Sequence, residues 1–187
     1  PARDDVEPDA NDRRSVLESL AREKGRTDRS PGPLSVCIFE IDGFDGLTRK
    51  HGRAAVGLIQ QRLGKRIRGE LRAMDGVTPG GARRSFDRTG EERYVALLPQ
   101  TNLSGAARCA ERIRAAIAKY PIDGRYAITV SAGIVEYRRG ESAAVLLGRA
   151  EAAVSRALEA AGNCIVGSAE GDAVPHADVI PMRGLRS

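Results

Sequence analysis

Residues 34–44 read LSVCIFEIDGF, and the fold class can be inferred from this segment and its neighbours. Its first eight residues are mostly apolar, several of them β-branched, which is typical of a buried strand. A glycine-rich bend follows, and apolar residues between Ala55 and Met74 then recur every three or four positions. That spacing predicts a helix of about 20 residues with one apolar stripe. A buried strand followed by an amphipathic helix is typical of α/β folds.

The alternation continues on both sides of this stretch. Val16 and Leu20 lie on the apolar face of an earlier helix that we expect to end near Gly25. Two strands around Gly90 predict a β-hairpin. We expect a further helix that begins after Ser104, with Ser104 as its N-cap. Another is expected over 143–161, with Val145 facing inward. The strands are predicted over 34–41, 85–89, 94–98, 126–135 and 163–166, the last as an edge strand. We therefore expect an α/β sandwich whose central mixed sheet has about five strands flanked by helices.

Length and composition indicate one globular domain with linkers. The chain has 187 residues, with 41% hydrophobic and 29% charged residues, which excludes collagen-like and wholly disordered classes. Residues 1–12 are acidic and 168–187 lack periodicity, so we expect linkers there and a domain over 13–167. No apolar run approaches the roughly 20 residues that cross a bilayer, so no membrane insertion is expected. Three cysteines without C-x-x-C spacing argue against a zinc site or disulfide framework and favour a cytoplasmic location.

The formal net charge of +5 comes mostly from arginine, and the arginines are spread along the chain. Such a distribution is more typical of a solvated surface than of a nucleic-acid site. There is no Trp, and aromatic residues make up 4% of the chain, so few side chains could stack on bases. We expect no nucleic-acid partner.

Two carboxylates lie close together where the first strand ends. Glu40 and Asp42 are two residues apart and so share one face of the strand. With a third carboxylate from the hairpin tip, Glu91 or Glu92, they could hold a hard divalent cation. The alternative is that these are ordinary solvated carboxylates at strand ends and turns.

A series of segments resembles the GGDEF domain of diguanylate cyclases in order and spacing, over roughly residues 5–167. The start of the first helix, DRRSVL at 12–17, is similar to that family's Asn-Arg-Arg motif. The other segments are EIDGF (40–44), HG (51–52), RTGEERYVALLP (88–99), AERIR (110–114), TVSAGI (129–134), RAEAA (149–153) and Asn163. The resemblance implies a ferredoxin-like sandwich of the nucleotidyl-cyclase type, with the signature on the hairpin, and a role in cyclic-di-GMP signalling. At His51 the family usually has an aromatic residue, so we expect a packing or loop role there, and we expect His176 to lie in a linker.

The signature itself departs from the family. It reads Gly90, Glu91, Glu92, Arg93 and Tyr94, where the family has Gly-Gly-Asp/Glu-Glu-Phe. The resemblance implies that Glu91 would place a carboxylate against the nucleotide triphosphate. At about 4 Å and an effective dielectric of about 20, that repulsion costs about 4 kcal/mol.

Other family positions are changed as well. Glu40 and Glu92 fall where the resemblance places the metal ligands, so a vestigial metal pair is expected. The guanine-reading residues of the family align with Thr48 and Gly57, its next signature Glu with Arg93, and its phosphate-binding Lys and Arg with Leu158 and Gly162. We therefore expect no catalytic residues and no required cofactor, with Mg²⁺ only if a nucleotide binds.

One family feature is kept in sequence. Arg72 and Asp75 match the Arg-x-x-Asp inhibitory site, which in cyclases binds cyclic-di-GMP. Residues 76–89 make a longer connection to the signature than the family has, and Arg83, Arg84 and Arg88 in it are candidates for further phosphate contacts. The alternative for Arg72 and Asp75 is a pair of charged residues at a helix end.

Three functions are left open by the sequence. The first is an inactive GGDEF-like regulatory domain that acts through a protein partner or attached signalling domains. The second is a cyclic-di-GMP receptor using Arg72 and Asp75. The third is a weak residual diguanylate cyclase or GTP-binding domain using Glu40 and Glu92 with magnesium.

Overall fold

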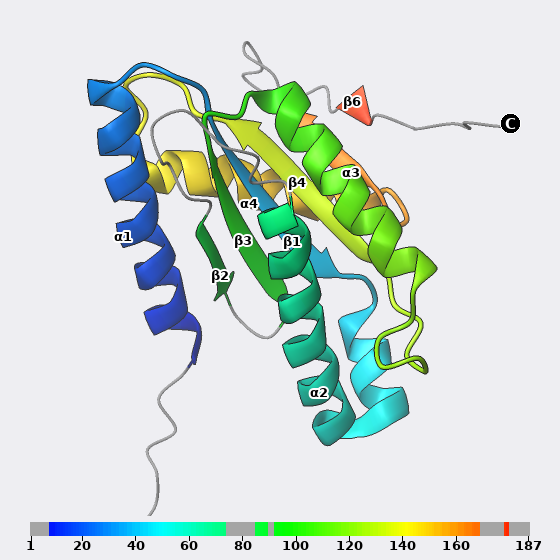
Figure 1. Ribbon diagram of the computed structural model, residues 1–187. Coiled ribbons are helices and arrows are strands. Elements are labelled where there is room, and N and C mark those ends of the chain that lie inside the picture. Colours follow the sequence, from blue (N-terminus) through cyan, green and yellow to red (C-terminus); the bar gives the residue numbers. More distant parts are fainter. Residues whose placement is uncertain (1–7, 74–84, 90–91, 169–177, 180–187) are drawn as a thin grey trace, which may run out of the picture.

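The computed structural model describes residues 8–73, 85–89, 92–168 and 178–179 of the chain (Figure 1). Four helices and six strands form an α/β sandwich in this part of the chain. The helices are α1 (Pro8–Arg29), α2 (Phe44–Ala73), α3 (Leu103–Lys119) and α4 (Ala143–Glu159). The strands are β1 (Leu34–Ile41), β2 (Ser85–Thr89), β3 (Arg93–Pro99), β4 (Val130–Glu136), β5 (Ile165–Ser168) and β6 (Asp178–Val179).

The strands form one mixed sheet in the order β2-β3-β1-β4-β5-β6. β1 lies between β3 and β4 and is antiparallel to both, whereas β4 and β5 are parallel. The run β1-α2-β2-β3-α3-β4 gives the ferredoxin-like strand order, to which α4 and β5 add a further unit. The predicted fold class is confirmed, and the sheet has one short strand, β6, beyond the five that the sequence predicted.

The helices cover both faces of the sheet and bury two apolar clusters. α2 and α3 pack on one face, where Phe39, Leu63 and Ile113 are fully buried (Figure 1). α1 and α4 pack on the other face, against Val36 and Ile38. Successive β1 side chains alternate between the clusters, which is why the strand is apolar along its whole length. Of the described helices, none has a stretch long and apolar enough to cross a membrane.

The helices differ from their predicted bounds at the N-terminal end. α1 begins at Pro8, so residues 8–12 of the predicted linker are helical, and it continues through Gly25 to Arg29. A single glycine within a helix costs only about 1 kcal/mol relative to alanine, which tertiary packing offsets. α2 begins already at Phe44 and is interrupted at Gly52, whose φ of 78° and ψ of 162° are not helical. The predicted glycine-rich bend is thus a turn at Asp42 and Gly43, where the φ of Gly43 is 63°, followed by the interruption at Gly52.

Caps and strand ends also differ. Asn102, not Ser104, caps α3, because its side chain accepts a hydrogen bond from the Gly105 N–H. The predicted strand 126–135 begins only at Val130, since Tyr126 is paired with Ile122 in a separate bridge.

The last helix and strands depart from the prediction as well. Val145 was expected inside but is 53% exposed, because it lies in the first turn of α4 and faces away from the sheet, whereas Leu147 is buried. α4 ends at Glu159 rather than at residue 161. β5 is parallel to β4 and is not an edge strand, because β6, within the predicted C-terminal linker, pairs with it.

Candidate functional site

The register of the sheet brings the signature segment to the end of β1. In the antiparallel pair β1 and β3, Arg93 lies directly opposite Glu40. The backbone N–H of Ile41 donates to the carbonyl oxygen of Glu92 at 3.1 Å. The end of β1 and the start of β3 thus lie side by side, in line with the prediction that the hairpin segment approaches Glu40. Gly90 and Glu91 lie outside the described residues.

Glu40 and Arg93 form an ion pair across the two strands. Nε of Arg93 donates to Oε2 of Glu40 at 2.5 Å, and the side chains are 33% and 9% exposed, respectively. Cross-strand neighbours of opposite charge stabilise a sheet, and a nearly buried carboxylate needs such a partner. From the sequence we expected Arg93 to replace an acidic residue of the family signature. That Arg93 also neutralises Glu40 became visible only from the register of β1 and β3.

The guanidinium of Arg93 disfavours a divalent cation at Glu40. A divalent ion about 4 Å from the guanidinium would be repelled by about 8 kcal/mol at an effective dielectric of about 20. Among the described residues, no three His, Cys, Asp or Glu side chains come together in a way that could hold a metal ion. Arg93 thus opposes a cation beside Glu40, and the metal pair of Glu40 and Glu92 that the resemblance implied stays a prediction.

Asp42, the second carboxylate, is anchored entirely by neutral donors. Its Oδ2 accepts from the Thr129 hydroxyl at 2.6 Å and from the Asn163 backbone N–H at 2.9 Å. Its Oδ1 accepts from the Ser131 hydroxyl at 2.7 Å. These bonds tie the end of β1 to β4 and to the loop between α4 and β5. Asp42 acts here as a cross-link within the fold.

The cross-link extends to α3 through Asn163. Arg114 donates to Oδ1 of Asn163 at 2.5 Å and forms a bidentate pair with Glu111 at 2.7 and 2.8 Å. Hydrogen bonding to Glu111 raises the pKa of Arg114, so it stays a cation. Burial, with a smaller contribution from Asp42, raises the pKa of the Cys164 thiol. Cys164 is therefore neutral and donates its S–H to the Ala157 carbonyl oxygen at 3.2 Å.

The positions that align with the family's base-reading residues hold neither an amide nor a carboxylate. The Thr48 hydroxyl donates to the Phe44 carbonyl oxygen of its own helix at 3.1 Å. Gly57 is exposed and has no side chain. Neither residue has the amide or carboxylate that the resemblance assigns to guanine reading, and the one hydroxyl proton of Thr48 is already used within the helix.

The positions that align with the phosphate-binding residues lack a cation. Leu158 is partly buried and apolar. Gly162 has a φ of +73°, and a Cβ built there would lie 2.9 Å from Oδ1 of Asp42. The backbone and the Asp42 anchor together favour glycine at 162, so a side chain there would disturb the cross-link.

The residues predicted to bind cyclic-di-GMP lie largely beyond what can be described. Arg72 is in the last turn of α2, two residues after Glu70, whose backbone oxygen accepts from Arg112 at 2.9 Å. The Arg72 side chain, Asp75, Arg83 and Arg84 lie outside the described part. Arg88 lies opposite Tyr94 in the pair β2 and β3, and its side chain is not described either. These assignments stay predictions.

Two ring-bearing residues singled out from the sequence, His51 and Tyr94, have contacts within the fold. His51 packs edge-to-face on Tyr126, with ring centroids 5.2 Å apart and an interplanar angle of 87°, in line with the expected packing role. Tyr94, the last residue of the signature, is 2% exposed and donates its hydroxyl to the Gln60 carbonyl oxygen at 2.9 Å. His176 lies outside the described residues.

Comparison with known proteins places these features in a family context. A family model described as "Diguanylate cyclase, GGDEF domain" matches residues 5–164. The diguanylate cyclase DgcP of Pseudomonas aeruginosa is 31% identical over 151 residues, which cover 79% of this chain and 21% of DgcP. The chain thus spans about a fifth of the length of that relative.

Two solved structures share the fold. The diguanylate cyclase SiaD of Pseudomonas aeruginosa, in complex with its activator SiaC, matches with a TM-score of 0.73 and 25% identity, covering 83% of this chain and 58% of SiaD. The GGDEF domain of DgcB from Caulobacter crescentus, in complex with cyclic-di-GMP, matches with a TM-score of 0.72 and 22% identity, covering 89% and 98%.

Proposed function

This chain belongs to the GGDEF domain family, and from that premise we propose that it is a catalytically inactive regulatory member in cyclic-di-GMP signalling. The observation that carries the proposal is the ion pair between Glu40 and Arg93. A signature residue that is acidic in the family is here a cation, and it neutralises the carboxylate that the resemblance assigns to metal binding. The proposed inactive state is thus stabilised by the protein's own charges.

The remaining departures point the same way. Phosphoryl transfer depends mostly on positioning and on electrostatic stabilisation of the phosphates. Thr48 and Gly57 lack the amide and carboxylate that would orient a guanine, and Leu158 and Gly162 carry no positive charge. Mg²⁺ would enter only together with a bound nucleotide, and no cofactor is required for the proposed role.

A regulatory role requires a partner protein or attached domains. The relative DgcP is much longer than this chain, so domains attached on either side are one source of control. SiaD, which shares this fold over 58% of its length, is solved with a protein activator, and this supports control by a protein partner. We propose that this chain acts through such contacts.

A turnover assay tests the proposal. The purified chain is incubated with GTP and Mg²⁺, and cyclic-di-GMP is measured by mass spectrometry, with full-length DgcP as the positive control. We expect no product above the blank without protein. Product that disappears in Glu92→Ala would contradict the proposal and would favour the residual cyclase. A GTP titration under the same conditions decides whether nucleotide binding survives without turnover.

A cyclic-di-GMP receptor is the second candidate. It is supported by Arg72, which is in the last turn of α2 close to the contact between Glu70 and Arg112, and by the DgcB domain, which is solved with this ligand. Calorimetric titration with cyclic-di-GMP tests it. Binding that weakens by about tenfold or more in Arg72→Ala supports a receptor, and the absence of binding heat rules it out.

A further inference from the structure

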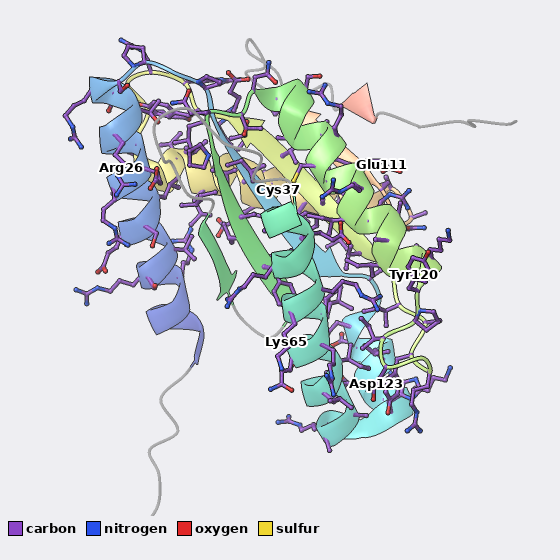
Figure 2. All side chains as sticks on the ribbon, in the orientation of Figure 1. Arg26, Cys37, Lys65, Glu111, Tyr120 and Asp123 are labelled. Atoms are coloured by element: carbon purple, nitrogen blue, oxygen red, sulfur yellow. The ribbon has the colours of Figure 1, made fainter. Side chains whose placement is uncertain are left out.

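The positive charge of the chain is concentrated in one helical layer. α2 and α3, which cover one face of the sheet, together hold twelve Lys and Arg against three Asp and Glu, a net charge of +9. α1 and α4 on the other face hold eight against seven, a net charge of +1. We call the α2 and α3 side the basic layer; Lys65 and Glu111 mark its two helices in Figure 2. The arginines are spread along the sequence, but in the fold the basic layer holds most of the excess positive charge behind the formal net charge of +5.

A groove of about 400 Å³ runs along α3 within this layer. Its α3 wall includes Ser104, Ala107, Glu111 and Ala115, which are spaced three or four residues apart and so lie on one side of the helix. Ile165 of β5 lies on the other side of the groove. Three of the four α3 residues are small, which allows the axis of another helix to approach to about 8 Å. From Ser104 to Ala115 the groove is about 16 Å long, or three helical turns.

The rim of the groove carries guanidinium groups. Glu111, its one acid among the described lining residues, is neutralised by the bidentate pair with Arg114. Arg112 is bound to Glu70 at 3.3 Å. Arg108 is exposed and donates to the Ser104 hydroxyl at 2.9 Å, and in the described part of the chain it forms no ion pair with a carboxylate. The groove is therefore apolar inside and positive at its edge, with Arg108 open to an external acid.

We propose that this groove binds an acidic amphipathic helix of a partner protein, with its apolar row on Ala107, Ala115 and Ile165 and its carboxylates on Arg108. The inference rests on the proposed regulatory function, for which it supplies the kind of partner. Nucleic acid fits less well, because the described lining holds no aromatic ring for base stacking. An anionic membrane fits less well too, because the apolar surface is recessed, whereas lipid binding favours apolar groups that protrude.

Fluorescence polarisation with a labelled model peptide tests the proposal. The peptide is a helix of about 15 residues, or four turns, with Leu at every third or fourth position and Glu beside it. One matched peptide has Lys in place of Glu, and another has Ser in place of Leu. We expect the dissociation constant of the acidic amphipathic peptide to be at least about tenfold lower than that of either matched peptide.

Matched variants of the protein locate the binding. Arg108→Glu changes the rim, and Arg22→Glu makes the same change on α1, where Arg22 likewise donates to a serine hydroxyl one turn away, that of Ser19 at 2.8 Å. We expect binding to weaken about tenfold or more in Arg108→Glu and less than about twofold in Arg22→Glu. Ala115→Tyr fills the groove at an exposed position and should abolish binding, whereas Ala118→Tyr, also exposed but outside the groove, should not.

Three results would overturn the proposal. The first is no polarisation change with the acidic amphipathic peptide. The second is equal weakening by Arg108→Glu and Arg22→Glu, which would mean general attraction by net charge. The third is binding of duplex DNA or phosphatidylserine vesicles that depends on Arg108 while the peptide does not bind. None of these measurements involves GTP turnover, so this proposal and the proposed function can fail separately.

Discussion

Glu40 and Asp42 lie two residues apart at the end of β1, and the protein stabilises the two carboxylates in different ways. Glu40 is paired with one formal charge, that of Arg93, at a site that is partly open to solvent. Asp42 accepts three hydrogen bonds from neutral donors on two other segments of the chain. The first arrangement depends on a single residue, and the second is shared among β4 and the loop after α4.

The difference gives the two carboxylates different roles. Asp42 is structural, whereas Glu40 pairs with Arg93 where the resemblance implied a metal ion. Neutral donors hold Asp42 in place without changing its charge, so removing it would disturb the fold. Glu40 needs a cation, and Arg93 supplies one from within the chain. The predictions below test this contrast in order of decreasing effect.

Asp42→Ala should have the largest effect on stability. It removes three hydrogen bonds to a charged acceptor and leaves the Ser131 hydroxyl, which is 0% exposed, without this partner. We expect the free energy of unfolding in urea to fall by about 3 kcal/mol. Asp45→Ala, an exposed carboxylate in the first turn of α2, is the control and should cost less than about 1 kcal/mol. Equal losses in the two variants would contradict the anchoring role of Asp42.

Gly162→Ala should come next and should act on the same cross-link. The left-handed φ of +73° disfavours alanine by about 1–2 kcal/mol, and the added Cβ would press on Asp42. We expect a loss of about 2 kcal/mol in urea unfolding. Gly148→Ala within α4, where a Cβ would meet nothing within 4 Å, should instead stabilise the protein by up to about 1 kcal/mol. The same sign in both variants would argue against the backbone constraint at 162.

The pair between Glu40 and Arg93 should show a smaller coupling. A double-mutant cycle with Glu40→Gln and Arg93→Gln should give about 1–2 kcal/mol, less than a fully buried pair because Arg93 is a third exposed. The same cycle on Arg14 and Glu18, whose side chains are 79% and 56% exposed, should give about 0.5 kcal/mol or less. A coupling at Glu40 no larger than this control would mean that Arg93 does not compensate the carboxylate.

The smallest effect concerns the thiol next to the Asp42 cross-link. Burial, and then Asp42, raise the pKa of Cys164, so the reactive thiolate is scarcer than in a model thiol at the same pH. We expect alkylation of Cys164 by iodoacetamide, followed by mass spectrometry, to be slower than that of glutathione at pH 8.5, with its midpoint at higher pH. Asp42→Asn should move the midpoint down. Cys37, which is buried and whose pKa is also raised by burial, should not react in the native state. A midpoint for Cys164 equal to that of glutathione would contradict the effect of its surroundings.

The sequence predicted best where periodicity decides the structure. β1 and β2 have the predicted bounds because a run of apolar residues, or a pair of strands around a glycine, defines them locally. Helix ends were predicted less well: Asn102 and Ser104 are both good N-caps, and only the fold decides which one binds the Gly105 N–H. The exposed Val145 shows the same limit at the start of α4.

The site was predicted in part for a related reason. Glu40 and the signature could be brought together by the pattern of strands, but the pairing of Glu40 with Arg93 depends on register. The partners of Asp42 were missed because they lie far away in sequence. A signal was present, since Thr129 and Ser131 are polar residues two apart near a strand that is otherwise apolar and therefore lie on one face.

A Mn²⁺ titration of the wild-type chain and of Arg93→Glu, followed by electron paramagnetic resonance, tests most directly whether Arg93 stands in for a cation at Glu40. We predict that the wild-type chain shows no Mn²⁺ binding up to about 1 mM. Arg93→Glu should bind Mn²⁺ with a dissociation constant of about 0.1 mM or less, at least about tenfold below that limit. Wild-type binding below about 0.1 mM that is lost in Glu40→Gln would show that the carboxylate is available to a metal despite Arg93, and would contradict the proposed inactive site.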